Sequence, residues 1–301
     1  MDDRYVALGL GGIIAAGEPF MAHFGAALLA AWWFERDAQL PAETSMAMGS
    51  QADSMIAKHA WLFQLLPSDQ RPQADRIDEL VDAITGGLDH AWAIGHDVIY
   101  AALVVRTLQA RPEFASDAVI DGVLSVLSAC RAFPIDVIGG SFSVEGVEAD
   151  EVAQAEVTTD RALAEAALGA IVVSDHVYVG VHQGDLGHVP DHAHALIVLE
   201  RLGYHRAAQC GRVGFREHLA ALRRARHFTA DLPEARRRER ADPVGIEYWA
   251  RGSATNDWAL GHLFKYPYAI LDLLKRTGET SLAEPVLDRL QLLVTDEAER
   301  V

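Results

Sequence analysis

Histidine and aspartate alternate through one segment of this 301-residue sequence, SDHVYVGVHQGDLGHVPDHAHAL at 174–196. Neutral imidazoles and carboxylates that converge on one point suit zinc, iron or manganese. If Pro190 begins a helix, Asp191 and His194 share one face of it, and His188 can fold over the same end. The segment therefore predicts a metal site made of His188, Asp191, His192 and His194. The alternative is that these residues cap helices and line a solvated rim.

A second pattern places a histidine before each of four runs of small and apolar residues. These are His23 (HFGAALLAAWWF), His96 (HDVIYAALVV), His188 (HVPDHAHALIVL) and His262 (HLFKYPYAILDLL), and a glycine precedes each of the last three. A motif that recurs at such intervals predicts helices that start near a common opening, as in an α/α toroid-like or helical-repeat fold.

Three of these histidines are candidates for acid–base catalysis. A histidine beside a carboxylate exchanges protons near neutral pH, and Asp97 follows His96 directly. We therefore predict His96 and His262 as catalytic residues, with His23 as a third. The alternative for each is a core histidine that is hydrogen-bonded to a backbone carbonyl.

Lys265 stands in the otherwise apolar segment HLFKYPYAILDLL. A charge in such a run is costly unless it is paired or faces a pocket. Lys265 is thus a candidate contact for an anionic group of the substrate, with Trp258, Tyr266 and Trp92 as aromatic neighbours. The alternatives are that Lys265 extends to solvent and that the aromatic residues pack in the core.

The segments at 23–33, 96–105 and 262–279 resemble, in the same order, three histidine-containing helices of the questin oxidase-like family. The family differs at Ala22, where it tends to have asparagine, and at Asp97, where it has glycine. The resemblance implies an oxidoreductase that acts on an aromatic polyketide such as an anthraquinone, by ring-cleaving oxygen insertion. It further implies that His23, His96, His262 and Lys265 carry the function, and that NADPH is a cofactor.

Charge and composition exclude several classes of protein. The chain has 43 acidic and 26 basic residues, a formal net charge of −17 that repels phosphate backbones, so we expect no nucleic-acid partner. Gly17-Glu18-Pro19 divides the apolar stretch 5–34 into halves that are too short to span a bilayer, which predicts two core helices and no membrane partner. The acidic start of the chain does not resemble a signal peptide. Cys130 and Cys210 are the only cysteines and stand far apart, which favours a cytoplasmic location.

Helical periodicity extends over most of the remaining chain. It predicts helices at 77–84, 97–109, 117–131, 161–173, 195–203, 213–226, 262–276 and 281–290, the last with a capping box of Ser281 and Glu284. Residues 171–181 could form a strand, 133–147 an irregular excursion, and 228–256 the longest loop. The whole pattern predicts one all-α domain over residues 1–301.

The leading functional prediction is an intracellular oxidoreductase that acts on a small organic substrate in a histidine-lined helical pocket. One alternative is a metal-dependent hydrolase or oxygenase that uses the histidines and aspartates of 176–194. The other is a non-catalytic helical-repeat binding or scaffold protein. The cofactor would be a divalent metal (iron, manganese or zinc) or NADPH, and the chain could form a homo-oligomer.

Overall fold

A computed structural model of the chain describes residues 1–66, 71–133, 157–172, 182–228, 242–251 and 261–294, and within these ranges it contains helices and no strand. The α-helices are α1 (Arg4–Ala16), α2 (Ala22–Ala38), α3 (Ala42–Lys58), α4 (Asp78–Thr85), α5 (His96–Ala110), α6 (Asp117–Cys130), α9 (Asp160–Val172), α10 (His182–Arg201), α11 (His205–Phe228), α12 (Ile246–Arg251), α13 (His262–Thr277) and α14 (Thr280–Leu293). Short 3₁₀ helices lie at Ala74–Arg76, Trp92–Gly95 and Pro112–Phe114. The predicted all-α class is confirmed.

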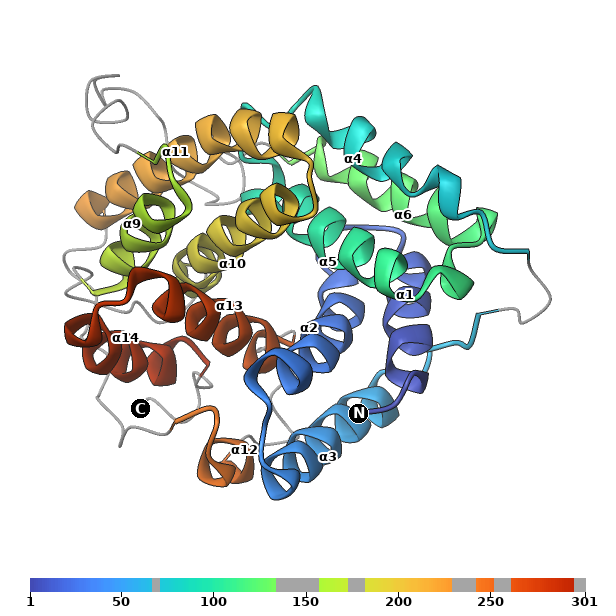
Figure 1. Cartoon of the computed structure of the whole chain (residues 1–301), viewed down its shortest axis with the longest axis horizontal. Helices are drawn as coiled ribbons and strands as arrows, with labels where there is room; N and C mark the ends of the chain where they lie inside the picture. Colours follow the sequence, from blue (N-terminus) through green and yellow to red (C-terminus); the bar gives the residue numbers. More distant parts are fainter. Residues whose placement is uncertain (67–70, 134–156, 173–181, 229–241, 252–260, 295–301) are drawn as a thin grey trace.

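Four helices form an inner ring. Helix α2 contacts α5, α5 contacts α10, α10 contacts α13, and α13 contacts α2, so that the ring closes on itself (Figure 1). Helices α1, α4, α6, α9, α11 and α14 pack outside it, each against at least one inner helix. The description of this arrangement as a toroid or a helical repeat stays a prediction, as do the domain boundaries at residues 1 and 301.

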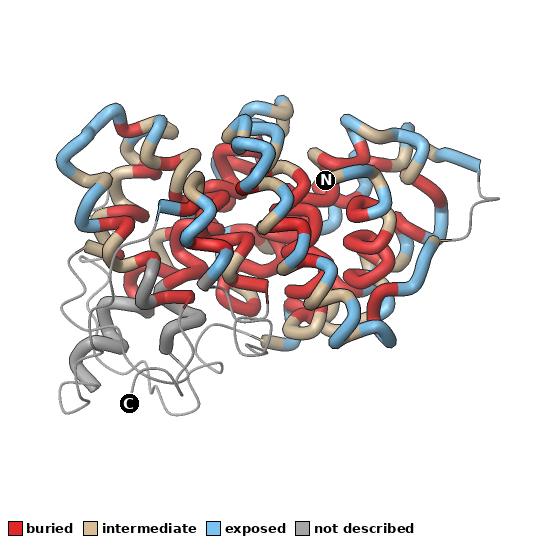
Figure 2. Tube along the Cα trace, turned by 90° about the horizontal axis from the view of Figure 1, so that it is seen from below, coloured by how far each residue is buried: buried red, intermediate tan, exposed pale blue. Residues whose placement is uncertain are grey.

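The inner position of α2 and α5 follows from their composition. Most residues of both helices are small or apolar, and nearly every side chain around their circumference is buried. A helix that is apolar on all sides is stable only when other elements surround it. Buried residues accordingly fill the middle of the molecule, and the exposed ones lie on its outer surface (Figure 2).

The apolar N-terminal stretch forms two core helices, α1 and α2, separated at Gly17-Glu18-Pro19 as predicted. In the part of the chain that the structure describes, no helix is long and apolar enough to cross a membrane.

Several predicted boundaries are wrong. The helix expected at 195–203 begins at His182, and Pro190 lies inside it instead of opening it. A proline removes one backbone hydrogen bond, and packing of α10 against α5, α9, α11 and α13 maintains the helix through that gap. The helix expected at 213–226 begins earlier, at His205.

The capping box is also wrong, because α14 begins at Thr280 and Ser281 lies within its first turn. Helix α12 occupies part of the predicted loop 228–256, and residues 229–241 and 252–256 of that loop lie outside the described residues. The predicted strand at 171–181 overlaps the end of α9 at residues 171–172, and its remainder lies outside them too. Residues 134–147 of the predicted excursion likewise fall outside the described part of the chain.

Candidate functional site

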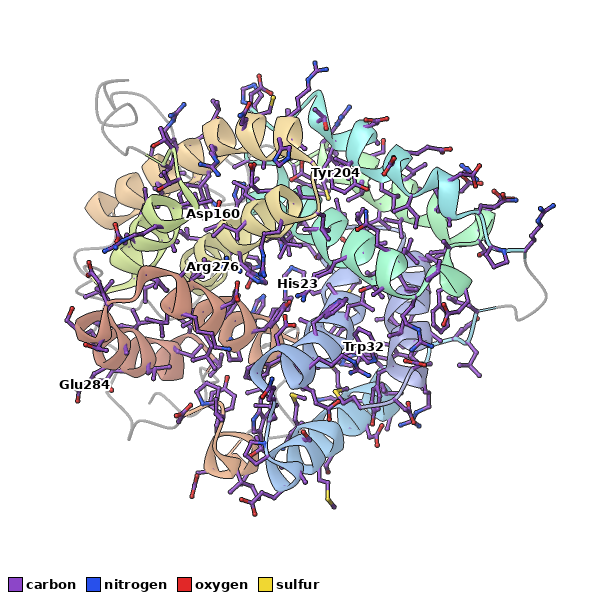
Figure 3. The ribbon with its side chains drawn as sticks, viewed as in Figure 1. His23, Trp32, Asp160, Tyr204, Arg276 and Glu284 are labelled. Atoms are coloured by element: carbon purple, nitrogen blue, oxygen red, sulfur yellow. The ribbon has the colours of Figure 1, made fainter. Side chains whose placement is uncertain are left out.

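Four histidine side chains meet in the middle of the inner ring. We call His23, His96, His188 and His262 the histidine cluster; they come from α2, α5, α10 and α13 and are only 1–3% exposed. The centroid of the His23 ring lies 4.2 Å from that of His96, 5.1 Å from that of His188 and 4.9 Å from that of His262. Figure 3 shows His23 near the centre of the ring of helices.

The predicted common starting point of four helices is correct for three of them. His96 and His262 are the first residues of α5 and α13, and His23 is the second residue of α2. His188 lies in the second turn of α10, so the expectation that it begins a helix is wrong.

Glycine allows two of these helices to begin beside the cluster. Gly95 and Gly261 have φ of 82° and 78°, in the left-handed region that disfavours residues with a Cβ atom. A Cβ at position 261 would also lie 2.2 Å from the Cβ of Ala27, because α13 starts directly against α2. The backbone conformation therefore favours glycine before His96 and before His262, and at position 261 the lack of space for a Cβ atom favours it as well.

The residues before His96 are strained. Ala93 and Ile94 have φ of 46° and 61°, and positive values are unusual for alanine and rarer still for a β-branched residue. The amide N–H of Ala93 donates to the carbonyl of Phe133 at 2.6 Å, which helps to hold this turn. Strain of this kind is concentrated at functional sites, where the surrounding structure compensates for it.

Three residues of the cluster are close enough together to be candidate metal ligands. His23, His96 and His188 each offer one ring nitrogen, and these three atoms lie within 4.8 Å of one another. Nε2 of His96 lies 2.8 Å from Nε2 of His188. Two nitrogens bound to one ion at about 2.1 Å are separated by about 3.0 Å at a right angle and by about 4.2 Å across the ion. The three nitrogens lie within 4.8 Å of one another, so the rings would have to move closer together for all three to bind one ion.

A lysine and a tyrosine support the imidazoles. Lys265 Nζ lies 2.7 Å from Nδ1 of His23, and the hydroxyl of Tyr266 lies 3.3 Å from Nδ1 of His188. The Tyr266 ring also stacks on His262, with a centroid separation of 4.4 Å. Lys265 is 2% exposed, so the alternative in which it extends to solvent is wrong.

Burial alters the proton affinities in this region. Burial, together with the charge of Lys265, holds the pKa values of His23, His96 and His262 well below their usual range. Burial lowers the pKa of Lys265 to about 8, partly opposed by the charge of Asp191, and it raises the pKa of Asp191 to about 7. The imidazoles of His23, His96 and His262 are therefore neutral at neutral pH, which is the form that binds metal ions.

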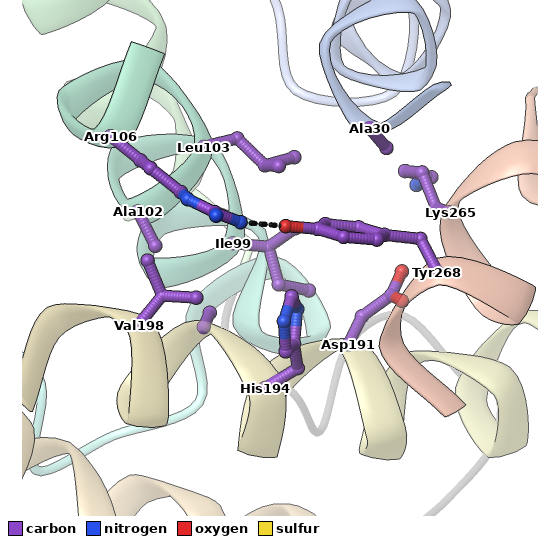
Figure 4. A pocket seen from close by; sticks show the side chains of 11 residues that line it. Ala30, Ile99, Ala102, Leu103, Arg106, Asp191, His194, Val198, Lys265 and Tyr268 are labelled. Atoms are coloured by element: carbon purple, nitrogen blue, oxygen red, sulfur yellow. Dashed lines mark hydrogen bonds between the residues drawn. The ribbon is translucent and has the colours of Figure 1, made fainter. Parts of the chain in front are cut away.

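A pocket adjoins the cluster through Lys265 (Figure 4). Its cavity volume is about 20 Å³, and the space around this cavity is open to solvent. Its apolar walls are Ala30, Ile99, Ala102, Leu103, Ala195 and Val198, and its polar lining consists of Arg106, Asp191, His194, Lys265 and Tyr268. The Asp191 side chain extends from α10 into the pocket, beside Tyr268.

The charges along one wall of this pocket are paired. The Arg106 guanidinium donates to both carboxylate oxygens of Asp37, at 2.7 Å and 2.9 Å, and also contacts the hydroxyl of Tyr268. His194 Nε2 lies 3.4 Å from a carboxylate oxygen of Asp272. These pairs leave Asp191 and Lys265 as the polar groups at the end of the pocket near the cluster.

The structure does not bring the four predicted metal ligands His188, Asp191, His192 and His194 to one point. His188 joins the cluster and Asp191 lines the pocket, but Nδ1 of His192 lies 3.3 Å from Nδ1 of His218, and His194 faces Asp272. His188 and His192 are four residues apart and share a face of α10, where each meets a different neighbour one turn from the other, and His194 points away from that face. All four residues of the set are buried, so the alternative of a solvated rim is wrong.

Of the residues predicted as aromatic neighbours of the substrate, the structure places Tyr266 at the site and Trp92 away from it. Tyr266 contacts His188 of the histidine cluster. Trp92 instead donates its Nε1–H to the carbonyl of Gly87 at 2.9 Å and does not line the pocket. Trp258 lies outside the described residues. Sequence reasoning missed Arg106 and His218, because a lone arginine or histidine on a helix carries no local signal of what it will face.

Comparison of the chain with protein-family models, with curated proteins and with solved structures found no match. Its function must therefore be argued from the chemistry of the site. The resemblance to the questin oxidase-like family stays a prediction.

Proposed function

We propose that this protein is a metal-dependent oxidoreductase that acts on a small organic substrate. His23, His96 and His188 would hold the metal ion, His262 and Lys265 would lie beside it, and the substrate would occupy the adjoining pocket. The observation that carries the proposal is the approach of three buried ring nitrogens to within 4.8 Å of one another.

The burial of so many polar groups supports binding of an ion. Imidazoles lose hydration when they are buried, and the cost is recovered only through hydrogen bonds or coordination. A structural core would place apolar side chains where the inner helices meet.

The type of ligand narrows the choice of metal. Imidazole nitrogens suit iron and zinc, and manganese stays a candidate because Asp191 lies nearby. An iron or manganese ion would supply one-electron redox chemistry, which zinc does not. The resemblance to the questin oxidase-like family favours the redox-active ions, because His23, His96, His262 and Lys265, the positions that it implies, all lie at this site.

The pocket supports a small-molecule substrate. Its walls are mostly apolar, and a few polar groups converge at the end near the cluster, as in many ligand sites. Lys265 lines the pocket and also contacts His23, so a bound molecule would lie next to the metal. A cytoplasmic location belongs to the same proposal, and NADPH stays an implication of the resemblance.

Elemental analysis and an absorbance spectrum of protein purified without chelators test this proposal. We expect about one equivalent of iron or manganese, which His23→Ala, His96→Ala and His188→Ala should each remove. The matched control is His90→Ala, because His90 is an exposed histidine beside Glu217. This variant should keep the metal.

Two results would overturn the proposal. Zinc alone, retained after incubation with ferrous or manganous ions, would favour the metal-dependent hydrolase. If the purified protein contains no metal and takes up none on titration with iron, manganese or zinc ions, the non-catalytic binding or scaffold protein is favoured.

A further inference from the structure

Asp191 is an unusual residue for the wall of an apolar pocket. It is 4% exposed, and in the described part of the chain its Oδ2 atom has no hydrogen-bond partner. A buried carboxylate oxygen without a partner is destabilising, so its presence calls for an explanation. The neighbouring acids are different, because Asp37 pairs with Arg106 and Asp272 pairs with His194.

Lys265 is the second polar group at the same end of the pocket. Its Nζ lies 2.7 Å from Nδ1 of His23, and whether Nζ donates to that atom as an ammonium or accepts from it as an amine, two further N–H bonds remain to donate. Lys265 and Asp191 both line this pocket and are of opposite type, a basic and an acidic side chain. The pocket thus presents an acceptor on Asp191 and a donor on Lys265 to the same space.

A hydroxyl group matches this pair, because it donates one hydrogen bond and accepts others. A carboxylate would be repelled by Asp191, and an ammonium by Lys265. A purely apolar molecule would leave Oδ2 of Asp191 and the remaining donors of Lys265 without partners, and a binding site discriminates most strongly against a molecule that leaves its polar groups unpaired. The walls formed by Ile99, Leu103 and Val198 favour an apolar body for the rest of the molecule.

We propose that Asp191 and Lys265 determine the specificity of this pocket for a small, largely apolar molecule with one hydroxyl group. The hydroxyl donates to Oδ2 of Asp191 and accepts from Nζ of Lys265. This inference rests on the proposed function in one respect: the hydroxyl-bearing carbon is thereby held beside the histidine cluster. The ligand-binding part can be tested without knowledge of the reaction.

Three probes of similar shape separate the two hydrogen bonds. Benzyl alcohol can donate and accept, benzyl methyl ether can only accept, and ethylbenzene can do neither. Their dissociation constants are measured on the full chain by ligand-observed NMR titration, with metal content recorded on the same samples. We expect benzyl alcohol to bind at least about 10-fold more tightly than the ether, as for hydrogen bonds to a charged group.

Variants assign the preference to Asp191. Asp191→Ala should reduce the ratio between alcohol and ether to about one while it preserves binding of ethylbenzene. Asp191→Asn should show a smaller preference than the wild type, because its amide oxygen still accepts a hydrogen bond. Val198→Ala changes an apolar wall of the same pocket and should leave the ratio unchanged. A melting curve for each variant confirms that it is folded.

The inference is overturned if the wild type binds the three probes equally, if benzyl alcohol shows no saturable binding, or if Asp191→Ala retains the preference. These outcomes are distinct from failure of the proposed function. Metal binding without a preference for the alcohol contradicts this inference alone. A preference for the alcohol in a protein that takes up no metal contradicts the metal-dependent oxidoreductase alone.

Discussion

Lys265 Nζ lies 2.7 Å from Nδ1 of His23, and the two side chains are 2% and 1% exposed. The two residues are far apart in the sequence, on the two adjacent inner helices α13 and α2. A buried cation beside an imidazole lowers the pKa of that imidazole and restricts the orientation of its ring. This contact links the pocket to the histidine cluster.

Lys265→Met should weaken metal binding and leave the fold intact. The variant keeps an apolar side chain of similar length but removes the group that orients His23. When His23 binds a metal through Nε2, its proton lies on Nδ1 and is donated to the uncharged amine of Lys265. Loss of such a supporting contact costs roughly 10- to 100-fold in metal affinity. The melting temperature should stay the same or rise, because a buried ammonium is removed.

The measurement is a metal titration of the variant together with a thermal melt. Lys275→Met is the matched control, since Lys275 is an exposed lysine on the same helix. Unchanged metal affinity in Lys265→Met would show that His23 is oriented without Lys265.

The metal-free protein should lose stability in mild acid. The folded-state pKa values of His23, His96 and His262 lie well below the ordinary value of 6.5, mainly because these side chains are buried. Below about pH 6.5 the unfolded chain therefore binds more protons than the folded one, and the free energy of unfolding decreases as the pH falls. Each such histidine contributes a slope of up to about 1.4 kcal/mol per pH unit.

Urea denaturation at several pH values between about 5 and 8 measures this slope. His96→Gln should reduce it, because glutamine does not titrate, whereas His90→Gln, at an exposed position, should not. An equal slope in the wild type and His96→Gln would mean that His96 is not responsible for the acid sensitivity.

Asp191→Asn should stabilise the protein, and the gain should increase with pH. The folded-state pKa of Asp191 is raised to about 7, above the ordinary 3.8 of an aspartate, because burial disfavours its charged form. Between these values the folded protein keeps a proton that the unfolded chain has lost, so this residue lowers stability as the pH rises. The gain should thus be small near pH 4 and reach a few kcal/mol, at most about 4, above pH 7.

Denaturation of the wild type and of Asp191→Asn at pH 5 and pH 8 provides the comparison. Asp272→Asn serves as the opposite case, because pairing with His194 and Arg276 holds the pKa of Asp272 below its usual range. That substitution should destabilise the protein near neutral pH. A gain for Asp191→Asn that decreases with rising pH would contradict the assignment.

Gly261→Ala should be far more damaging than Gly278→Ala, although both glycines have positive φ at the two ends of α13. The values are 78° at Gly261 and 64° at Gly278, and a Cβ there costs roughly 1–2 kcal/mol in either case. At position 261 the new Cβ would also lie 2.2 Å from the Cβ of Ala27, whereas position 278 is open within 4 Å. Gly261→Ala should therefore lose about 3 kcal/mol or more in total.

Chemical denaturation of both variants checks the stability difference, and metal content checks the site. Gly261→Ala should also lose metal, because α13 must move away from α2 and take Lys265 with it. Equal stability of the two variants would mean that the contact with Ala27 does not position α13.

The sequence by itself determined the local properties of the chain. The apolar stretch 5–34 was enough to predict two core helices, and the spacing of apolar residues in 97–109 was enough to predict a helix, because propensity and periodicity are local features. A glycine before His96 and before His262 marked the start of a helix for a similarly local reason. Lys265 in an apolar run left open whether its side chain faces a pocket or extends to solvent, and its burial excludes the second alternative.

Only the tertiary structure decided which of these residues meet. His188, His192 and His194 look alike in the sequence, yet His188 faces His96, His192 faces His218 and His194 faces Asp272. Positions on one helix differ in direction by about 100° per residue, and the neighbour that each one meets depends on packing across the whole ring. The histidine cluster exists because four helices far apart in the chain pack into one closed ring, and that packing is a collective outcome which no short segment encodes.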